Sequence, residues 1–284
     1  MTRPAYLAGT WYPSEETSCR REVERILAAA AVDPSDVPET VRGGLVPHAG
    51  WTFSGRTAAR TLKALAARDR LGRVVIFGTD HGRLSGPGAV YAKGAWATPL
   101  GEVPVDADLA GAVLGACEEL TADPDAHAGE NSIEIQVPLL KALADDVRIV
   151  PVMLSLRPEA AAIGRRVGEL LARDAPEASV LGSSDLTHYG PRYRFSPAGA
   201  GESGLTWARE NDRRIIKLIE EMRAAEVVAE AGERQNACGG GAVAAAIEAC
   251  SALGATRGQC LEYTTSSEVV GGLETVGYAS VIFF

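Results

Sequence analysis

The feature that most limits how this chain can fold is a set of short apolar runs, each followed at once by a polar loop. Runs that are apolar throughout are typical of parallel strands buried on both faces of a sheet. Segments with helical periodicity separate them, so we predict an α/β fold of three layers around a mixed, mostly parallel central sheet. The clearest of these runs are Gly44–Val46, Arg73–Phe77, Val147–Met153 and Ser179–Ser183.

Helical patterns fill the intervals between these strands. An amphipathic helix is expected after Ser14, which we predict as its N-cap. Two runs at the end of the chain, Leu261–Thr265 and Gly277–Phe284, are predicted to close the sheet. No internal repeat or linker divides the chain, so residues 1–284 are predicted to form a single domain. Further helices are expected over Thr57–Ala67, within Val105–Glu119, and over Pro158–Arg173 and Trp207–Arg223.

Composition narrows the class of partner. The net charge is −9 and no basic stretch stands out, which argues against a nucleic-acid partner. No apolar run is long enough for a membrane span, and the first residues lack the apolar core of a signal peptide. The five cysteines are odd in number and irregularly spaced, which favours a reducing cytoplasm over a disulfide framework. We therefore expect a cytoplasmic protein that binds neither nucleic acid nor membrane, and its oligomeric state is left open.

Two histidines follow directly on predicted strands. His48 comes two residues after Gly44–Val46, and His81 follows Arg73–Phe77 between glycines. Ligands of open α/β sheets bind at the carboxyl ends of the strands, so both loops are expected to open on one edge of the sheet. Asp80 would either orient the imidazole of a ligand by accepting a hydrogen bond from its other ring nitrogen, or be only a turn residue.

Polar residues also follow the strand at Ser179–Ser183. Asp185 and His188 lie three residues apart, and a carboxylate that fixes an imidazole tautomer suits general acid–base catalysis. Ser183 and Ser184 lack the Gly-x-Ser-x-Gly context of a hydrolase nucleophile. Cys238 precedes three glycines and an Ala-rich helix, a position that lowers a thiol pKa.

Other polar and aromatic residues admit two interpretations. Trp11 and Tyr12 are either core residues, which is the simpler interpretation, or a wall of the active-site cleft. Glu130 and Glu134 begin a predicted helix and would face either the site or solvent. His127 lies among turn-forming residues and is expected at the surface, whereas Cys117 is expected in the core.

The motifs together resemble the Memo family, also called the AmmeMemoRadiSam system protein B family. The fold of that family is similar to that of class III extradiol dioxygenases, which use non-haem iron. The blocks that carry the resemblance run in the family's order over nearly the whole chain: Ala8–Pro13, Pro47–Gly55, Gly78–His81, Glu130–Pro138, Ser183–Gly190, Ala237–Gly239 and Val276–Ala279.

The resemblance implies one metal ion bound by His48, His81 and Cys238, with Asp185 and His188 beside it. Two imidazoles and a thiolate suit iron or copper, and zinc would also accept them; iron is our first expectation. The chain has Gly82 and Asn131 where the family usually has histidines, which puts in doubt any proton relay through those side chains.

Two functions follow from the resemblance. The first is a non-haem iron oxygenase or related oxidoreductase for a small organic substrate. The second is a copper-binding or copper-sequestering protein, or a scaffold that recognises a peptide without catalysis. The acid–base pair Asp185 and His188 favours the first. So do the aromatic residues expected to wall the site and bind substrate, which are Trp11, Tyr12, Trp51 and Tyr189.

Overall fold

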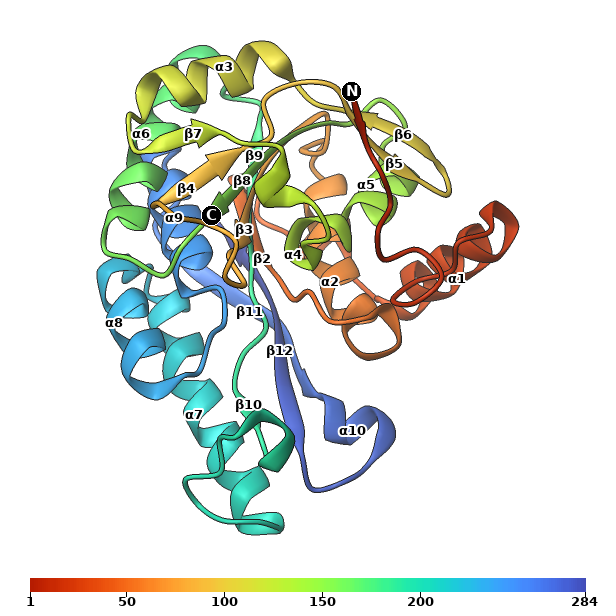
Figure 1. Cartoon of the computed structure of the whole chain (residues 1–284), viewed down its shortest axis with the longest axis vertical. Helices are drawn as coiled ribbons and strands as arrows, with labels where there is room; N and C mark the ends of the chain where they lie inside the picture. Colours follow the sequence, from red (N-terminus) through yellow and green to blue (C-terminus); the bar gives the residue numbers. More distant parts are fainter.

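The structure is a computed structural model that describes residues 1–284. A nine-stranded sheet runs through the middle of the molecule, in the strand order β10-β12-β2-β9-β3-β8-β4-β7, with β11 paired to β12 (Figure 1). Its strands are β2 (Gly43–Val46), β3 (Arg73–Thr79), β4 (Gly88–Val90), β7 (Leu120–Ala122), β8 (Arg148–Leu154), β9 (Ser179–Ser183), β10 (His188–Tyr189), β11 (Gly258–Thr265) and β12 (Thr275–Phe283).

The centre of the sheet is parallel and its flanks are antiparallel. Strands β2, β9, β3 and β8 run parallel to one another, and every residue of β2 and β9 is buried. Strand β12 joins β2 antiparallel on one side, and β4 joins β8 antiparallel on the other. The apolar runs thus form the doubly covered centre, and the prediction of a mixed α/β sheet is confirmed.

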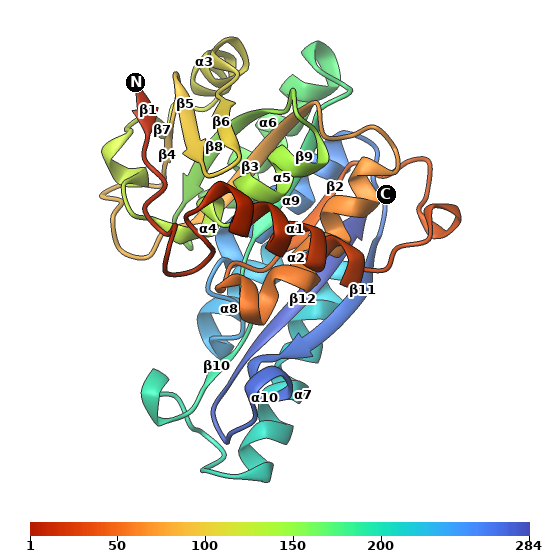
Figure 2. The same cartoon turned by 90° about the vertical axis from the view of Figure 1, so that its right-hand side faces the viewer.

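Helices cover both faces of the sheet. Helix α9 lies against β9, β3 and β2, while α2 covers β2, β11 and β12 on the opposite face (Figures 1 and 2). The layer on the α9 face contains α6 (Glu159–Asp174), α7 (Glu202–Glu220), α8 (Ala224–Arg234) and α9 (Gly240–Ala252), with α3 (Ala107–Ala116) beside α6. The layer on the α2 face contains α1 (Glu16–Ala29), α2 (Trp51–Ala66), α4 (Asn131–Glu134) and α5 (Val137–Leu143). None of the helices is both long and apolar enough to cross a membrane.

Several boundaries differ from those predicted. Helix α2 begins at Trp51 rather than Thr57, because the carbonyl of Trp11 accepts the Trp51 N–H and fixes the first turn. The N-cap of α1 is Glu15, and no side chain caps that helix, so the prediction for Ser14 was wrong.

A second, three-stranded sheet and a short helix were not predicted. The sheet consists of β1 (Thr2–Arg3), β5 (Ala95–Thr98) and β6 (Gly101–Pro104), and it brings the N-terminus to residues far along the chain. The short helix α10 (Ser266–Val270) lies in the connection between β11 and β12, at the far end of that hairpin (Figure 2).

Candidate metal centre

His48 lies in the loop between β2 and α2, and its environment fixes its tautomer. The side chain is 2% exposed, and its Nδ1 lies 2.9 Å from Oγ of Ser183. That hydroxyl donates its own proton to the carbonyl of Ser132 at 2.6 Å, so it can only accept from the imidazole. Nδ1 therefore carries a proton, and Nε2 is free to bind a metal.

His81 follows β3 and is oriented by a carboxylate. Both oxygens of Glu130 lie near its Nδ1, at 2.9 and 3.1 Å, which again leaves Nε2 free. Glu130 is 2% exposed and also accepts the N–H of Ser132. Asp80 does not reach the ring, because its Oδ1 accepts the backbone N–H groups of residues 82–84. The partner of His81 is thus Glu130, and Asp80 is a turn residue.

Cys238 reaches the two histidines from the loop between α8 and α9. Its Sγ lies 3.1 Å from Nε2 of His48, the nitrogen that Ser183 leaves free. The backbone of Gly239 passes so close to β9 and β3 that a Cβ there would lie 2.3 Å from the carbonyl oxygen of Ser183 and 2.3 Å from Oγ1 of Thr79. Only glycine fits after the cysteine, and this close approach brings the thiol to the strand ends.

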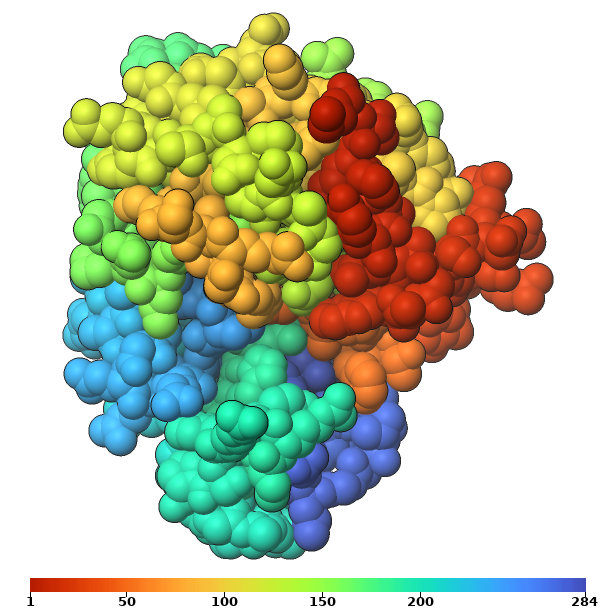
Figure 3. Space-filling view, in the orientation of Figure 1, coloured from red at the N-terminus to blue at the C-terminus, as the bar shows by residue number.

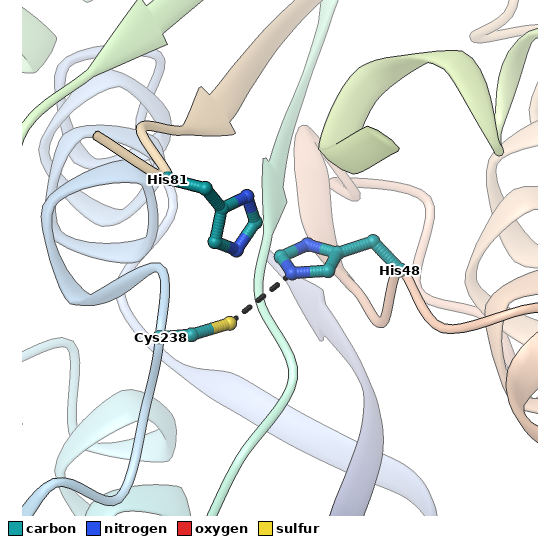
Figure 4. Close-up of side chains that lie close together, drawn as sticks. All are labelled: His48, His81 and Cys238. Carbon is teal, nitrogen blue, oxygen red and sulfur yellow. Dashed lines mark hydrogen bonds between the residues drawn. The ribbon is translucent and has the colours of Figure 1, made fainter. Parts of the chain in front are cut away.

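The three side chains converge on one point (Figure 4). One ligand atom from each lies within 4.8 Å of the other two, and the two imidazole rings are 5.4 Å apart at an angle of 89°. Metal bonds to these atoms are about 2.0–2.3 Å long, so neighbouring ligand atoms on one tetrahedral ion lie about 3.3–3.8 Å apart. Small side-chain movements suffice to reach that geometry, and the donor set is one that iron, copper and zinc all accept.

The charged forms of Cys238, His81 and Glu130 stabilise one another. Burial raises the pKa of the Cys238 thiol, but the two imidazoles outweigh burial and lower it to about 5. Burial lowers the pKa of His81, whereas its hydrogen bonds to Cys238 and Glu130 raise it to about 10. For Glu130, burial raises the pKa and the hydrogen bond from His81 then brings it down to about 2. The cysteine is thus a thiolate at neutral pH, which is the form that binds metals.

Asp185 contacts the loop that carries His48, whereas His188 is bonded neither to Asp185 nor to the three converging side chains. Oδ1 of Asp185 accepts the backbone N–H of His48 at 2.6 Å, whereas Nδ1 of His188 lies 3.0 Å from the carbonyl of Leu186. The tautomer of His188 is therefore set by a backbone carbonyl, and the expectation that Asp185 fixes it was wrong. Nε2 of His188 remains available for a proton.

Both residues line a cavity of about 660 Å³. That volume suits a small organic ligand, for which pockets of about 300–1,000 Å³ are usual. The aromatic side chains on its wall are Trp11, Phe53, Tyr193 and Tyr278, of which the sequence had pointed only to Trp11.

The other three expected aromatics are core residues that do not line this cavity. Tyr12 is 4% exposed, donates its hydroxyl to Glu134 and stacks on Trp51 with ring centres 5.0 Å apart. Trp51 donates its indole N–H to a backbone carbonyl. Tyr189 is 1% exposed and packs against Trp207. The simpler interpretation of Tyr12, as a core residue, describes its position.

His127 is also in the interior, with no exposed surface, so its predicted place at the surface was wrong. Its ring lies edge-on to Tyr91 and Trp96, and neither ring nitrogen has a hydrogen-bond partner. Turn-forming neighbours indicated a loop, and the chain turns there through the 3-10 helix Asp125–His127, but Arg3 of β1 and Trp96 of β5 pack against it. Cys117 lies in the core as predicted.

Comparison with known proteins identifies the family. The family model described as Memo-like protein matches residues 3–282. The chain belongs to the Memo family. It is 36% identical to a MEMO1 family protein of Methanopyrus kandleri, over 100% of this chain and 99% of the relative. A MEMO1 family protein of Thermococcus onnurineus is 35% identical, again over 100% of this chain and 99% of the relative.

The two departures from the Memo pattern lie at the edge of the centre. Asn131 donates its amide to the carbonyl of His48 at 3.1 Å, so it supports the loop that carries this ligand. Gly82 is exposed and has a φ of +95°, and a Cβ added there would meet no neighbour within 4 Å. Neither position adds a further candidate ligand to the group formed by His48, His81 and Cys238.

Proposed function

We propose that this Memo-family chain binds one metal ion through His48, His81 and Cys238, and that it is an iron-dependent oxidoreductase that consumes O₂. Two observations carry the proposal: the three side chains converge, and Asp185, which accepts the backbone N–H of His48, lines a cavity of about 660 Å³ together with His188. The three converging side chains do not themselves line this cavity. A carrier needs ligands only. An enzyme also needs a place for substrate and a group that moves its proton.

Different residues would bind the metal and transfer the proton. Nε2 of His48 and of His81 and Sγ of Cys238 would bind the metal, since Ser183 and Glu130 occupy the other ring nitrogens. When iron is bound, the thiolate lowers the potential of its Fe(III)/Fe(II) couple, which favours redox chemistry with O₂. His188 would take a proton from the substrate at Nε2, while the Leu186 carbonyl fixes its ring.

The cavity wall supports a small organic substrate. The rings of Trp11, Phe53, Tyr193 and Tyr278 line the cavity and would orient a planar or apolar molecule. The backbone N–H of His48 fixes one oxygen of Asp185, so its carboxylate is aimed from the cavity wall in a constant direction.

A test begins with protein loaded with Fe²⁺ under nitrogen. Candidate catechols or aromatic amines are added, air is admitted, and O₂ is followed with an electrode. Uptake in the wild type and in a Cys260→Ala control, with loss in Cys238→Ala, would support the proposal, because Cys260 lies on β11 away from the centre.

The second candidate is a copper-binding or sequestering protein. The thiolate and the 39% exposure of the His81 side chain favour it, since an exchanging ion needs soft ligands and access. Tight Cu⁺ binding, with no O₂ uptake above the Cys238→Ala control across a broad panel, would decide for this carrier.

A further inference from the structure

One buried carboxylate fastens the N-terminal segment to the rest of the molecule. Glu134 is 1% exposed, and its two oxygens accept four hydrogen bonds, all from residues 3–12. The donors are Arg3 at 2.6 Å, the backbone N–H groups of Tyr6 and Leu7 at 3.2 and 2.7 Å, and the hydroxyl of Tyr12 at 2.8 Å. Figure 3 shows this segment in red on the surface, beside yellow-green atoms from the middle of the chain.

Arg3 extends the connection toward the metal centre. Its Nε donates to the carbonyl of His127 at 2.9 Å, and its Nη2 donates to the carbonyl of Glu130 at 3.0 Å. The guanidinium also lies 4.0 Å from the ring centre of Trp96, which fixes its plane. One side chain thus ties together both ends of the turn that carries Glu130.

The same turn presents the Glu130 carboxylate to His81. Residues Arg3 and Glu134 touch none of the three converging side chains, yet they fix the backbone from which the partner of His81 projects. At its other end the N-terminal segment carries Trp11, which lines the cavity and accepts the N–H of Trp51 at 3.1 Å.

We propose that Arg3 and Glu134 are positioning residues of the metal centre, acting through Glu130 on His81. The inference rests on the proposed metal site, whose ligands it concerns. Groups that orient a metal-binding imidazole commonly change metal affinity about 10–100-fold when they are removed. An arginine is required at position 3 because its planar fork donates to four acceptors at once, which are the carbonyls of Pro4, His127 and Glu130 and the carboxylate of Glu134. The single nitrogen of lysine cannot span them.

Two variants test this on the full chain. Arg3→Lys retains the charge opposite Glu134 but loses the reach to the carbonyls of His127 and Glu130. Glu134→Gln is isosteric, removes the charge opposite Arg3, and leaves one acceptor oxygen in place of two for the four N-terminal donors. We expect each variant to bind Co²⁺ about 10-fold more weakly than the wild type and to alter the ligand-field spectrum of the bound ion.

A second measurement does not depend on metal. The N–H of Ser132 donates to Oε1 of Glu130 at 2.9 Å, so its hydrogen exchange reports directly on that carboxylate. We expect exchange at Ser132 to accelerate about 10-fold in both variants of the metal-free protein. Exchange at Tyr6 and Leu7 should accelerate in Glu134→Gln and much less in Arg3→Lys.

Asp106→Asn is the matched control. Asp106 is 3% exposed, pairs with Arg73 and accepts a backbone N–H, but Arg73 begins β3 at the end opposite to His81. The Asp106→Asn variant should leave hydrogen exchange at Ser132 and the Co²⁺ spectrum unchanged. If Glu134→Gln does not fold, the double variant Arg3→Met/Glu134→Gln is used in its place, because it leaves no buried charge unpaired.

The outcomes separate the two proposals. Wild-type exchange at Ser132 in Arg3→Lys would overturn the positioning role, as would Co²⁺ affinity within twofold of the wild type. A wild-type protein that binds no Co²⁺, Fe²⁺ or Cu⁺ would overturn the proposed function, while faster exchange at Ser132 would still show that Arg3 positions Glu130.

Discussion

Sγ of Cys238 lies 3.1 Å from Nε2 of His48, and that nitrogen is the one that the hydroxyl of Ser183 leaves without a partner. Without a metal, a thiolate and an imidazolium can share one proton at this point. A metal ion would take the place of that proton, so metal binding should release protons and weaken at acid pH. The contact thus links the ionisation of both side chains to occupancy of the centre.

The first prediction concerns the reactivity of Cys238. Because the imidazoles of His48 and His81 lower the pKa of this thiol to about 5, the metal-free protein should react rapidly with iodoacetamide at pH 7. The rate should fall as the pH drops through 5, and a bound metal should suppress it. Mass spectrometry of the labelled peptides measures this.

Cys260 serves as the internal control for that experiment. Burial raises the pKa of its thiol to about 11, so it should remain unlabelled at pH 7. Equal labelling of Cys238 and Cys260 would contradict the thiolate assignment.

The second prediction separates ligands from their neighbours. His48→Ala should lose metal, whereas His188→Ala should retain nearly wild-type metal content, because His188 lines the cavity and is not among the three converging side chains. Any turnover should fall about 10²–10⁴-fold in His188→Ala if this residue transfers the proton. Elemental analysis and O₂ uptake on the same samples check both parts, and loss of metal from His188→Ala would contradict its assigned place.

Features set by neighbouring residues could be predicted from the sequence, whereas contacts between residues far apart in the sequence could not. The strands β2, β3 and β9 are apolar between their end residues, so their burial and the exit of His48 and His81 at one edge could be predicted. The contact of Glu130 with His81 spans 49 residues and depends on how the turn before α4 packs. Periodicity carries no such information.

The aromatic residues show a second limit. Trp51 lies close to His48 in the sequence, but its side chain is in the core, where it stacks on Tyr12. The cavity wall instead uses Tyr193 and Tyr278, whose positions depend on a 3-10 turn and on strand β12. An apolar ring satisfies the core and a cleft equally well, so residue type alone could not distinguish the two sites.

The third prediction follows from the buried ring of His127. Burial, and then the charge of Arg3, lower its pKa to about 4, against 6.5 for an unperturbed histidine. The unfolded chain therefore binds the proton first, so stability is complete above pH 6.5 and is lost as the pH falls from 6.5 to 4. Between pH 7 and pH 5 this group should cost ~2 kcal/mol.

Urea denaturation of the wild type and of His127→Leu at both pH values measures this loss. The variant removes a ring whose nitrogens have no partner, so it should lose less stability on acidification by the same ~2 kcal/mol. Parallel losses in the two proteins would mean that His127 titrates normally.

The last prediction concerns Gly239, the residue that lets the backbone after Cys238 approach β9 and β3. In Gly239→Ala the new Cβ would lie 2.3 Å from the carbonyl oxygen of Ser183, a backbone atom that cannot move aside without displacing the strand. We expect the loop to shift outward, with about 1–3 kcal/mol of stability lost and weaker metal binding.

Gly232→Ala is the control, since Gly232 lies within α8 with nothing within 4 Å of the added Cβ. That change should stabilise the protein by about 0.5–1 kcal/mol, because alanine favours a helix interior more than glycine does. Thermal unfolding and Co²⁺ titration of both variants measure the difference. Wild-type affinity and stability in Gly239→Ala would show that the close approach does not set the position of the thiol.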